Sequence, residues 1–269
     1  MQTQLSLQLM TASLTQLDGT ASARRHFRYF DYMLAAFVAI LLLSNLIGAS
    51  KLSFVVVPGL ASILSWLPEM FRPASDTVIF GAGIMFFPIS YVLGDILTEV
   101  YGYANARRCV WAGFAALLFM AFMSYVVVAL PPASGWSGQA AYESVFGSTW
   151  RIVAASVIAF WAGEFVNSFV LAKMKILTGG SKLWARTIGS TVFGQAVDSA
   201  LFYPIAFLGT WSNSQVVTVM VVNWFLKVMW EVVLTPVTYA VVGWLKRREG
   251  VEVFDTGTDF SPFAKSSAV

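Results

Sequence analysis

Long apolar segments, separated by short polar and basic stretches, run through most of the chain. A helix needs about 20 predominantly apolar residues to cross the hydrocarbon core of a membrane. Six segments reach that length, and they lie at residues 30–50, 77–101, 108–130, 150–174, 186–209 and 215–246. This pattern predicts an all-α integral membrane protein with six transmembrane helices.

Residues 52–75 are also apolar, but Pro58-Gly59, Pro68 and Pro73 interrupt them. Proline removes a backbone hydrogen-bond donor and breaks a helix. The segment therefore favours a short interfacial or re-entrant helix over a full span. A seventh span at this place is the alternative.

The basic residues between the segments indicate the orientation of the chain, since cytosolic loops of membrane proteins carry an excess of Lys and Arg. If the N-terminus is cytosolic, twelve basic residues near span ends fall inside: Arg24, Arg25, Arg28, Arg107, Arg108, Lys173, Lys175, Lys182, Arg186, Lys246, Arg247 and Arg248. Three fall outside, namely Lys51, Arg72 and Arg151. A seventh span would invert every later loop, so the charges favour six spans with both termini cytosolic.

The composition agrees with a membrane protein, because 58% of the residues are hydrophobic and only 12% are charged. A soluble domain has about 45–50% apolar and about 25% charged residues. The net charge is +3 and the basic residues mark loops, so no nucleic acid partner is expected. A single cysteine, Cys109, and a single histidine, His26, argue against a disulfide framework, a metal site and Ser-His catalysis. We expect neither catalytic residues nor a cofactor.

The two ends of the chain differ from its middle. Residues 1–28 contain no Lys or Arg before Arg24 and lack the features of an export signal, which predicts a cytosolic N-terminal tail. Residues 29–248 form the predicted membrane domain. Residues 249–269 combine acidic residues with Gly, Ser and Pro, which predicts a disordered cytosolic tail.

Six ionisable residues lie in the interior of the predicted spans, away from the charged residues at the span ends, although a charge near the bilayer centre costs about 2.5–3.5 kcal/mol on insertion scales. They are Asp95, Glu99, Glu164, Asp198, Lys227 and Glu231. Residues three or four apart share a helix face, so each charge extends into a polar stripe bordered by aromatic residues. The candidate substrate-binding residues are Tyr91, Asp95, Glu99, Trp161, Glu164, Asn167, Gln195, Asp198, Phe202, Asn223 and Lys227, together with Asn45. Such stripes suit a flat, polar small molecule and disfavour a wide ion channel.

Lys227 and Glu231 lie one helical turn apart, and two interpretations of them stay open. In the first, they neutralise each other within their helix. In the second, they change partners or protonation during a transport cycle, which makes them candidate coupling residues.

Three of the stripes share a short pattern of a glycine, a polar residue, two apolar residues and two small or polar residues. It reads GDILTE at 94–99, GEFVNS at 163–168 and GQAVDS at 194–199. Glycine allows helices to approach closely. The second and fifth spans hold equivalent places in two three-helix halves of opposite orientation, so the pattern is compatible with an inverted repeat. Chance similarity is the alternative.

Three stretches around these residues carry a resemblance to a known family. They read FPISYVLGDILTEVYGYANARR at 87–108, GEFVNSFVLAKMK at 163–175 and RTIGSTVFGQAVDSALFYPIAF at 186–207. They resemble the signatures of the vitamin-uptake-transporter family, best known as the bacterial queuosine precursor transporters. Asn223 and Lys227 also fit the family pattern of the last helix, and the resemblance extends over residues 30–245.

The resemblance implies a multi-pass protein of the bacterial inner membrane that imports 7-cyano- and 7-aminomethyl-7-deazaguanine for salvage into tRNA queuosine. The stripes suit such a substrate, since a carboxylate can accept two N–H donors of a guanine-like edge and an amide both donates and accepts. Aromatic rings suit the flat base. The implied partners are the substrate and the lipid bilayer. A homodimer stays open, and no ATPase partner is expected.

Other functions compete with this one. A substrate-capturing subunit of an energy-coupling-factor vitamin importer would need ATPase partners, and the chain itself has no Walker motif. An importer of another flat heterocycle would use the same stripes. An intramembrane aspartyl protease is disfavoured, because Val92 stands where the first glycine of its Gly-x-Gly-Asp site is required before Gly94 and Asp95.

Overall fold

The computed structural model describes residues 27–48, 52–63, 65, 76–81, 86–147 and 150–264. Its long helices are α2 (Phe30–Gly48), α4 (Phe87–Tyr101), α5 (Tyr103–Ala129), α7 (Trp150–Leu177), α8 (Leu183–Phe207) and α9 (Asn213–Glu249). The shorter elements are β1 (Leu52–Val56), α3 (Leu60–Ile63), β2 (Thr77–Gly81) and α6 (Gln139–Phe146). The predicted N-terminal tail lies outside the described residues up to position 26.

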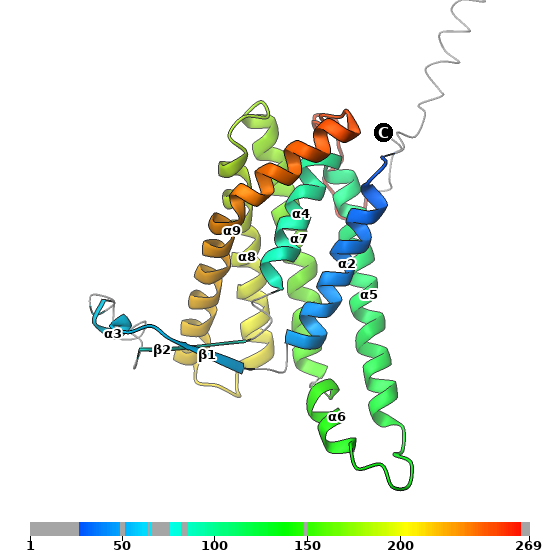
Figure 1. Cartoon of the computed structure of the whole chain (residues 1–269), viewed down its shortest axis with the longest axis vertical. Coiled ribbons are helices and arrows are strands. Elements are labelled where there is room, and N and C mark those ends of the chain that lie inside the picture. The colour runs from blue at the N-terminus through cyan, green and yellow to red at the C-terminus, as the bar shows by residue number, and fades with distance from the viewer. Residues whose placement is uncertain are drawn as a thin grey trace, which may run out of the picture.

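The long helices form one bundle (Figure 1). In this view α8 and α9 lie on one side, α4 and α7 in the middle, and α2 and α5 on the other side. The apolar core forms where α2, α4, α5 and α7 meet, and it contains the buried side chains of Phe37, Ile96, Val110 and Phe160. The most extensive helix pair is α7 with α8, and α9 packs against both α8 and α4.

Four described stretches are long and apolar enough to cross a membrane. They are Phe30–Ile47 in α2, Tyr103–Ala129 in α5, Gln139–Leu177, which contains α7, and Asn213–Glu249 in α9. Helix α4 is shorter, with 15 residues, and α8 carries polar residues along its length. The protein is therefore a helical multi-pass membrane protein, as its sequence predicts.

The region before α4 differs from the prediction. The second span was expected to begin at residue 77, but residues 77–81 form β2, which pairs antiparallel with β1. Of the short helix expected within 52–75, the described residues contain the four residues of α3, and residues 64 and 66–75 lie outside the described part of the chain. Three consecutive valines at 55–57 favour an extended backbone, and Gly59 then turns the chain with a φ of +80°. Among the described residues, this hairpin is the exception to an otherwise helical fold.

Two glycines bring α7 and α8 into direct backbone contact. A Cβ atom on Gly194 would lie 2.7 Å from the Cβ of Asn167, and one on Gly163 would lie 2.8 Å from the Cβ of Asp198. Neither position has space for a side chain, because backbone carbonyls of the partner helix lie beside it. The glycines of the repeated pattern at 163–168 and 194–199 are thus the contact points of the two helices.

Helix α9 bends in its second half and crosses the end of the bundle towards α2 (Figure 1). Pro236 lies within this helix, and a proline that lacks the helical N–H produces such a bend. At the end of α9, the carboxylate of Glu249 accepts hydrogen bonds from the backbone N–H of Arg28 at 2.9 Å and of Tyr29 at 2.7 Å. The first described residues and the end of the last helix therefore lie at the same end of the bundle.

Residues 251–264, which we call the C-terminal strap, pack along α5, in contrast to the predicted disordered tail. The buried carboxylate of Asp255 accepts hydrogen bonds from the backbone N–H of Tyr103 at 3.1 Å and so caps the first turn of α5. The Tyr103 hydroxyl donates to the carbonyl of Phe260 at 2.9 Å. Composition alone does not reveal these partners, because they lie about 150 residues away in the sequence.

The glycine contact predicts a specific loss of stability. Gly194→Ala places a Cβ against Asn167 and the carbonyl of Gly163, and overpacking of this kind costs about 1–3 kcal/mol. Gly243→Ala is the matched control, because its Cβ would meet only the Arg247 guanidinium at 3.5 Å. We expect the melting temperature of the detergent-solubilised protein to fall for Gly194→Ala and to stay level or rise for Gly243→Ala. Equal melting temperatures of the two variants would contradict the contact.

Candidate functional site

Polar side chains from α4, α7, α8 and α9 meet inside the bundle, and we call this group the central cluster. Its members are Tyr91, Asp95, Glu164, Asn167, Gln195, Asp198, Lys227 and Glu231. All of them are candidates that the sequence predicts. Asp95, Glu164 and Glu231 are at most 2% exposed, so these three carboxylates are buried in this structure.

A hydrogen bond between α4 and α7 fixes one side of the cluster. The amide nitrogen of Asn167 donates to Oδ1 of Asp95 at 2.6 Å. One turn further along, the Thr98 hydroxyl donates to the Ser168 hydroxyl at 3.1 Å. These two contacts set the rotation of both helices, so that their predicted polar stripes face each other.

Glu164 packs against the backbone of α4. A Cβ on Gly94 would lie 2.9 Å from Oε2 of Glu164, so the absence of a side chain at Gly94 makes room for the carboxylate. Neither carboxylate oxygen of Glu164 has a hydrogen-bond partner among the described residues. The pattern at 163–168 thus supplies a buried acid, Glu164. Gly94, in the pattern at 94–99, leaves the space that its carboxylate occupies.

Several further acceptor atoms in the cluster lack a partner within the described part of the chain. They are Oδ2 of Asp95, Oδ1 of Asn167, Oε1 of Gln195 and Oε1 of Glu231. The hydroxyls of Thr191 and Ser199 on α8 are buried and unpaired in the same way. Buried polar groups are nearly always hydrogen-bonded in native proteins, so this concentration of acceptors fits a ligand that brings several N–H donors, or protons.

Asp198 and Lys227 form an ion pair between α8 and α9. The ammonium lies 2.5 Å from Oδ2 of Asp198, and the two side chains are 17% and 13% exposed, respectively. This contact replaces the pair within the helix that the sequence allowed between Lys227 and Glu231. The ammonium also lies 5.7 Å from the ring centre of Tyr91, whose side chain is hydrogen-bonded to that of Gln195.

Glu99 belongs to a different group, which we call the end cluster. Its members are Glu99, Lys175, Arg186, Lys246 and Glu252. Three cations surround Oε1 of Glu99, with the nitrogens of Lys246, Arg186 and Lys175 at 2.7, 2.9 and 3.3 Å. Glu252 of the C-terminal strap adds contacts to Lys246 at 2.7 Å and to Lys175 at 3.0 Å.

The end cluster depends on ionised carboxylates. Partial burial raises the pKa of the Glu252 carboxyl, but the ammonium groups of Lys246 and Lys175 outweigh that effect, so its pKa lies below the ordinary value. A depressed pKa means that this contribution to stability is complete above the ordinary glutamate pKa and is lost as the pH falls through the lowered one. At neutral pH the Glu252 carboxylate is therefore ionised.

Two predicted binding residues, Asn223 and Asn45, form their hydrogen bonds with residues outside the central cluster. The amide of Asn223 donates to the carbonyl of Val219 at 3.0 Å. Asn45 of α2 accepts a hydrogen bond from the Ser156 hydroxyl of α7 at 3.0 Å, which is about two helical turns before Glu164.

Two predicted aromatic residues also pack elsewhere. The ring of Trp161 lies 5.9 Å from that of Trp111 on α5, and its indole Nε1 is buried without a partner in the described residues. Phe202 belongs to an aromatic group at the end of α8, with its ring 5.9 Å from that of Phe207. Sequence spacing placed these rings beside the acids, but helix rotation directs them to other neighbours.

The described side chains also bear on metal binding. No group of three or more His, Cys, Asp or Glu residues within them is arranged to hold a metal ion.

Comparison with known proteins then gives three related findings. A sequence model of a family described as "putative vitamin uptake transporter" matches residues 81–241, which is more than half of the chain. A protein of Bacillus subtilis (strain 168) named "probable queuosine precursor transporter" is 28% identical over 198 residues, which cover 72% of this chain and 85% of the relative. The "queuosine precursor transporter" of Escherichia coli (strain K12) is 27% identical over 125 residues, which cover 46% of this chain and 54% of the relative. No solved structure matches the chain significantly.

The Asp198–Lys227 pair predicts energetic coupling between α8 and α9. Removing one partner of a buried ion pair leaves a costly unpaired charge, so Asp198→Asn and Lys227→Met should each lower the melting temperature. The double variant should lose less than the sum, with an interaction energy of about 0.5–3 kcal/mol. Glu143→Gln, an exposed change on α6, should be additive with Lys227→Met. Additivity in both double variants would contradict the pair.

Proposed function

Since this chain belongs to the vitamin uptake transporter family, we propose that it imports queuosine precursors through a bacterial inner membrane. The proposed substrates are 7-cyano- and 7-aminomethyl-7-deazaguanine, for salvage into tRNA queuosine. The observation that carries the proposal is the set of buried, unpaired acceptors in the central cluster. It supports this substrate class because relatives are named queuosine precursor transporters.

The guanine-like edge of these molecules has the N–H donors that the unpaired acceptors of the cluster lack. It presents N–H donors beside a carbonyl acceptor. The Glu164 carboxylate has two free oxygens for the donors, and the amide of Gln195 has a free carbonyl as well. Tyr91 supplies an aromatic ring beside the same groups. The cation of the 7-aminomethyl form suits the excess of acids.

Access to Asp95, Glu164 and Glu231 requires helix movement, because these three carboxylates are almost fully buried. Transporters of this kind place the site between structural repeats and expose it alternately to the two sides. The bend of α9 at Pro236 lies about one turn beyond Glu231. Movement at this bend would shift Glu231 relative to Asp95 on α4, which faces it.

We assign coupling to Lys227 and Glu231, with the proton as the coupling ion. The central cluster contains four acids, Asp95, Glu164, Asp198 and Glu231, and the ion pair with Lys227 accounts for one of them. Buried charges are strongly unfavourable without a partner. Proton uptake by the remaining acids, followed by release when the cluster opens, would link transport to a proton gradient.

The proposed topology has six spans, with both termini cytosolic and two three-helix inverted repeats, α2-α4-α5 and α7-α8-α9. The hydrogen bonds from the backbone N–H groups of Arg28 and Tyr29 to the Glu249 carboxylate place the start of α2 and the end of α9 at the same end of the bundle. This supports an even number of membrane crossings. Glu99, near the end of α4, pairs with Arg186, near the start of α8. The middle helices of the two proposed repeats therefore run in opposite directions, as an inverted repeat requires. The proposed assembly is a transporter without an ATPase partner, active as one chain or a homodimer.

Uptake measurements test the function. Purified protein in liposomes should import labelled 7-cyano-7-deazaguanine without ATP, and an inward proton gradient should increase the rate. Glu164→Gln should weaken binding about tenfold or more, since a hydrogen bond to a charged group contributes about 1.5–3 kcal/mol. Glu143→Gln on exposed α6 is the control with the same chemical change and should bind normally.

Other outcomes of these measurements are equally informative. Substrate binding without uptake, restored by added ATPase subunits, would favour the energy-coupling-factor alternative. An uptake rate that does not change with the proton gradient would refute the coupling assignment and leave the substrate assignment intact. Normal binding by Glu164→Gln would place the substrate elsewhere.

Cysteine labelling tests the topology. In a Cys109→Ser background, a membrane-impermeant thiol reagent applied from outside should label cysteines at Ala140 in α6 and at Ser212 before α9. It should not label a cysteine at Ser181, which lies exposed between α7 and α8. Labelling at 181, or protection at both 140 and 212, would refute six spans with cytosolic termini.

A further inference from the structure

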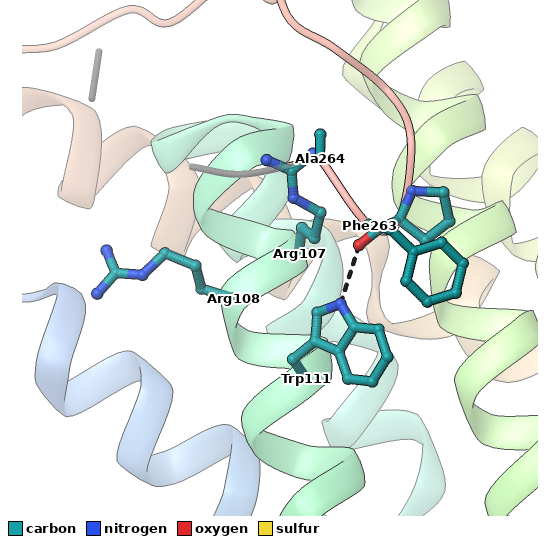
Figure 2. A pocket seen from close by; sticks show the side chains of 6 residues that line it. Arg107, Arg108, Trp111, Phe263 and Ala264 are labelled. Atoms are coloured by element: carbon teal, nitrogen blue, oxygen red, sulfur yellow. Dashed lines mark hydrogen bonds between the residues drawn. The ribbon is translucent and has the colours of Figure 1, made fainter. Parts of the chain in front are cut away.

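The first turns of α5 and the C-terminal strap line a second feature, whose residues do not belong to the central cluster. It is a cavity of about 400 Å³ lined by Arg107, Arg108, Trp111, Pro262, Phe263 and Ala264. Figure 2 shows the two arginines leaving α5 in different directions, with Trp111 below them. The lining contains two cations and no acid.

Arg107 is a nearly buried charge, only 5% exposed. Its Nη1 donates to the backbone carbonyls of Asp259 and Ser261, each at 2.8 Å. Within the described part of the chain, no carboxylate forms an ion pair with it. Carbonyl oxygens satisfy hydrogen bonds but do not neutralise a charge, and buried charges are normally paired.

Arg108 adds a second cation at the same place. Its guanidinium lies 5.6 Å from the ring centre of Phe30, and its Nη1 donates to the side-chain oxygen of Asn105 at 3.3 Å. Arg108 also forms no ion pair with a carboxylate of the described residues. The cavity is therefore lined by two cations that form no ion pair with a carboxylate of the described residues.

The position of the cavity on α5 indicates that an anion which pairs with the two arginines comes from the membrane. Helix α5 is apolar and long enough to cross a membrane, and Phe119 and Phe122 on it are 67% and 62% exposed. At 3.6 residues per turn, both lie on nearly the same side of the helix as Arg108. An exposed apolar face thus leads from the membrane interior to the arginines. Trp111 lies one turn from Arg108, and tryptophan is enriched at membrane surfaces.

We infer that this cavity binds the phosphate-containing headgroup of an anionic phospholipid. Guanidinium groups form short, charge-assisted hydrogen bonds with phosphate, and clusters of basic residues beside a membrane span attract anionic lipids. The acyl chains lie along the face of Phe119 and Phe122. Because Arg107 also holds the carbonyls of residues 259 and 261, the bound lipid stabilises the C-terminal strap on α5. The inference does not depend on the transported substrate.

Lipid titration of the purified full-length protein tests the site. Native mass spectrometry with phosphatidylglycerol should show one tightly bound lipid, whereas phosphatidylcholine should bind weakly. Arg108→Gln should weaken phosphatidylglycerol binding about fivefold, the effect of one basic residue near an anionic lipid. The matched control is Arg248→Gln, because Arg248 is exposed, stacks on Trp244 as Arg108 stacks on Phe30, and does not line the cavity.

Three outcomes would overturn the inference. The first is equal retention of phosphatidylglycerol and phosphatidylcholine by the unmodified protein. The second is equal binding of phosphatidylglycerol by the two arginine variants. The third is displacement of the lipid by millimolar inorganic phosphate, which would make the cavity a site for soluble anions. Both variants should keep the melting temperature in zwitterionic detergent, and this checks that a loss of binding is not a loss of fold.

Discussion

The close approach of α7 and α8 at Gly163 and Gly194 is the contact on which the site depends. With backbone against backbone, the next residues on each helix, Glu164 and Gln195, are fixed beside the same junction. Asn167 and Asp198 follow one turn later, and each lies against the glycine of the other helix. A larger residue at either glycine would separate α7 from α8 and so disperse the cluster, because the positions of these four side chains depend on the same helix contact.

Charge is divided between two places along the bundle. If every group is ionised, the central cluster has four acids and Lys227, a net charge of −3, whereas the end cluster has Lys175, Arg186 and Lys246 against Glu99 and Glu252, a net charge of +1. The two clusters, which differ in the sign of their net charge, thus lie about one helical turn apart along α4, where the central cluster contains Asp95 and the end cluster contains Glu99. This arrangement favours protons and N–H donors in the centre, where Lys227 pairs with Asp198 alone among the four acids of the cluster.

The sequence predicted long helices and the members of the central cluster because both depend on local spacing. Apolar length identifies the helices of a membrane protein, and the period of 3.6 residues places Asp95, Glu164 and Asp198 on polar faces. Glu99 was grouped with them for the same reason. Its partners come from three other helices, and spacing along the chain cannot reveal which helix end approaches another. The rotation that directs Trp161 towards α5 is equally non-local.

The C-terminal strap shows a second limit of composition. Its acidic, Gly- and Ser-containing sequence resembles a disordered tail, yet a few residues hold it to the bundle. Asp255 replaces the missing cap of α5, since Gly102 before that helix has no side chain and a φ of +81°. A Cβ on Gly102 would lie 2.8 Å from Val253, so the glycine also makes room for the strap.

The same strap carries Glu252 into the end cluster, and this links it to the central site. Glu99 joins α4 to α7, α8 and α9 through Lys175, Arg186 and Lys246. Any opening of the bundle at this end has to separate those contacts. Glu252, whose side chain is 46% exposed, is the acid of the group that is most accessible to water. Separation that begins at Glu252 exposes the smallest amount of unpaired charge, because Lys175 and Lys246 keep Glu99 as a partner while the strap moves.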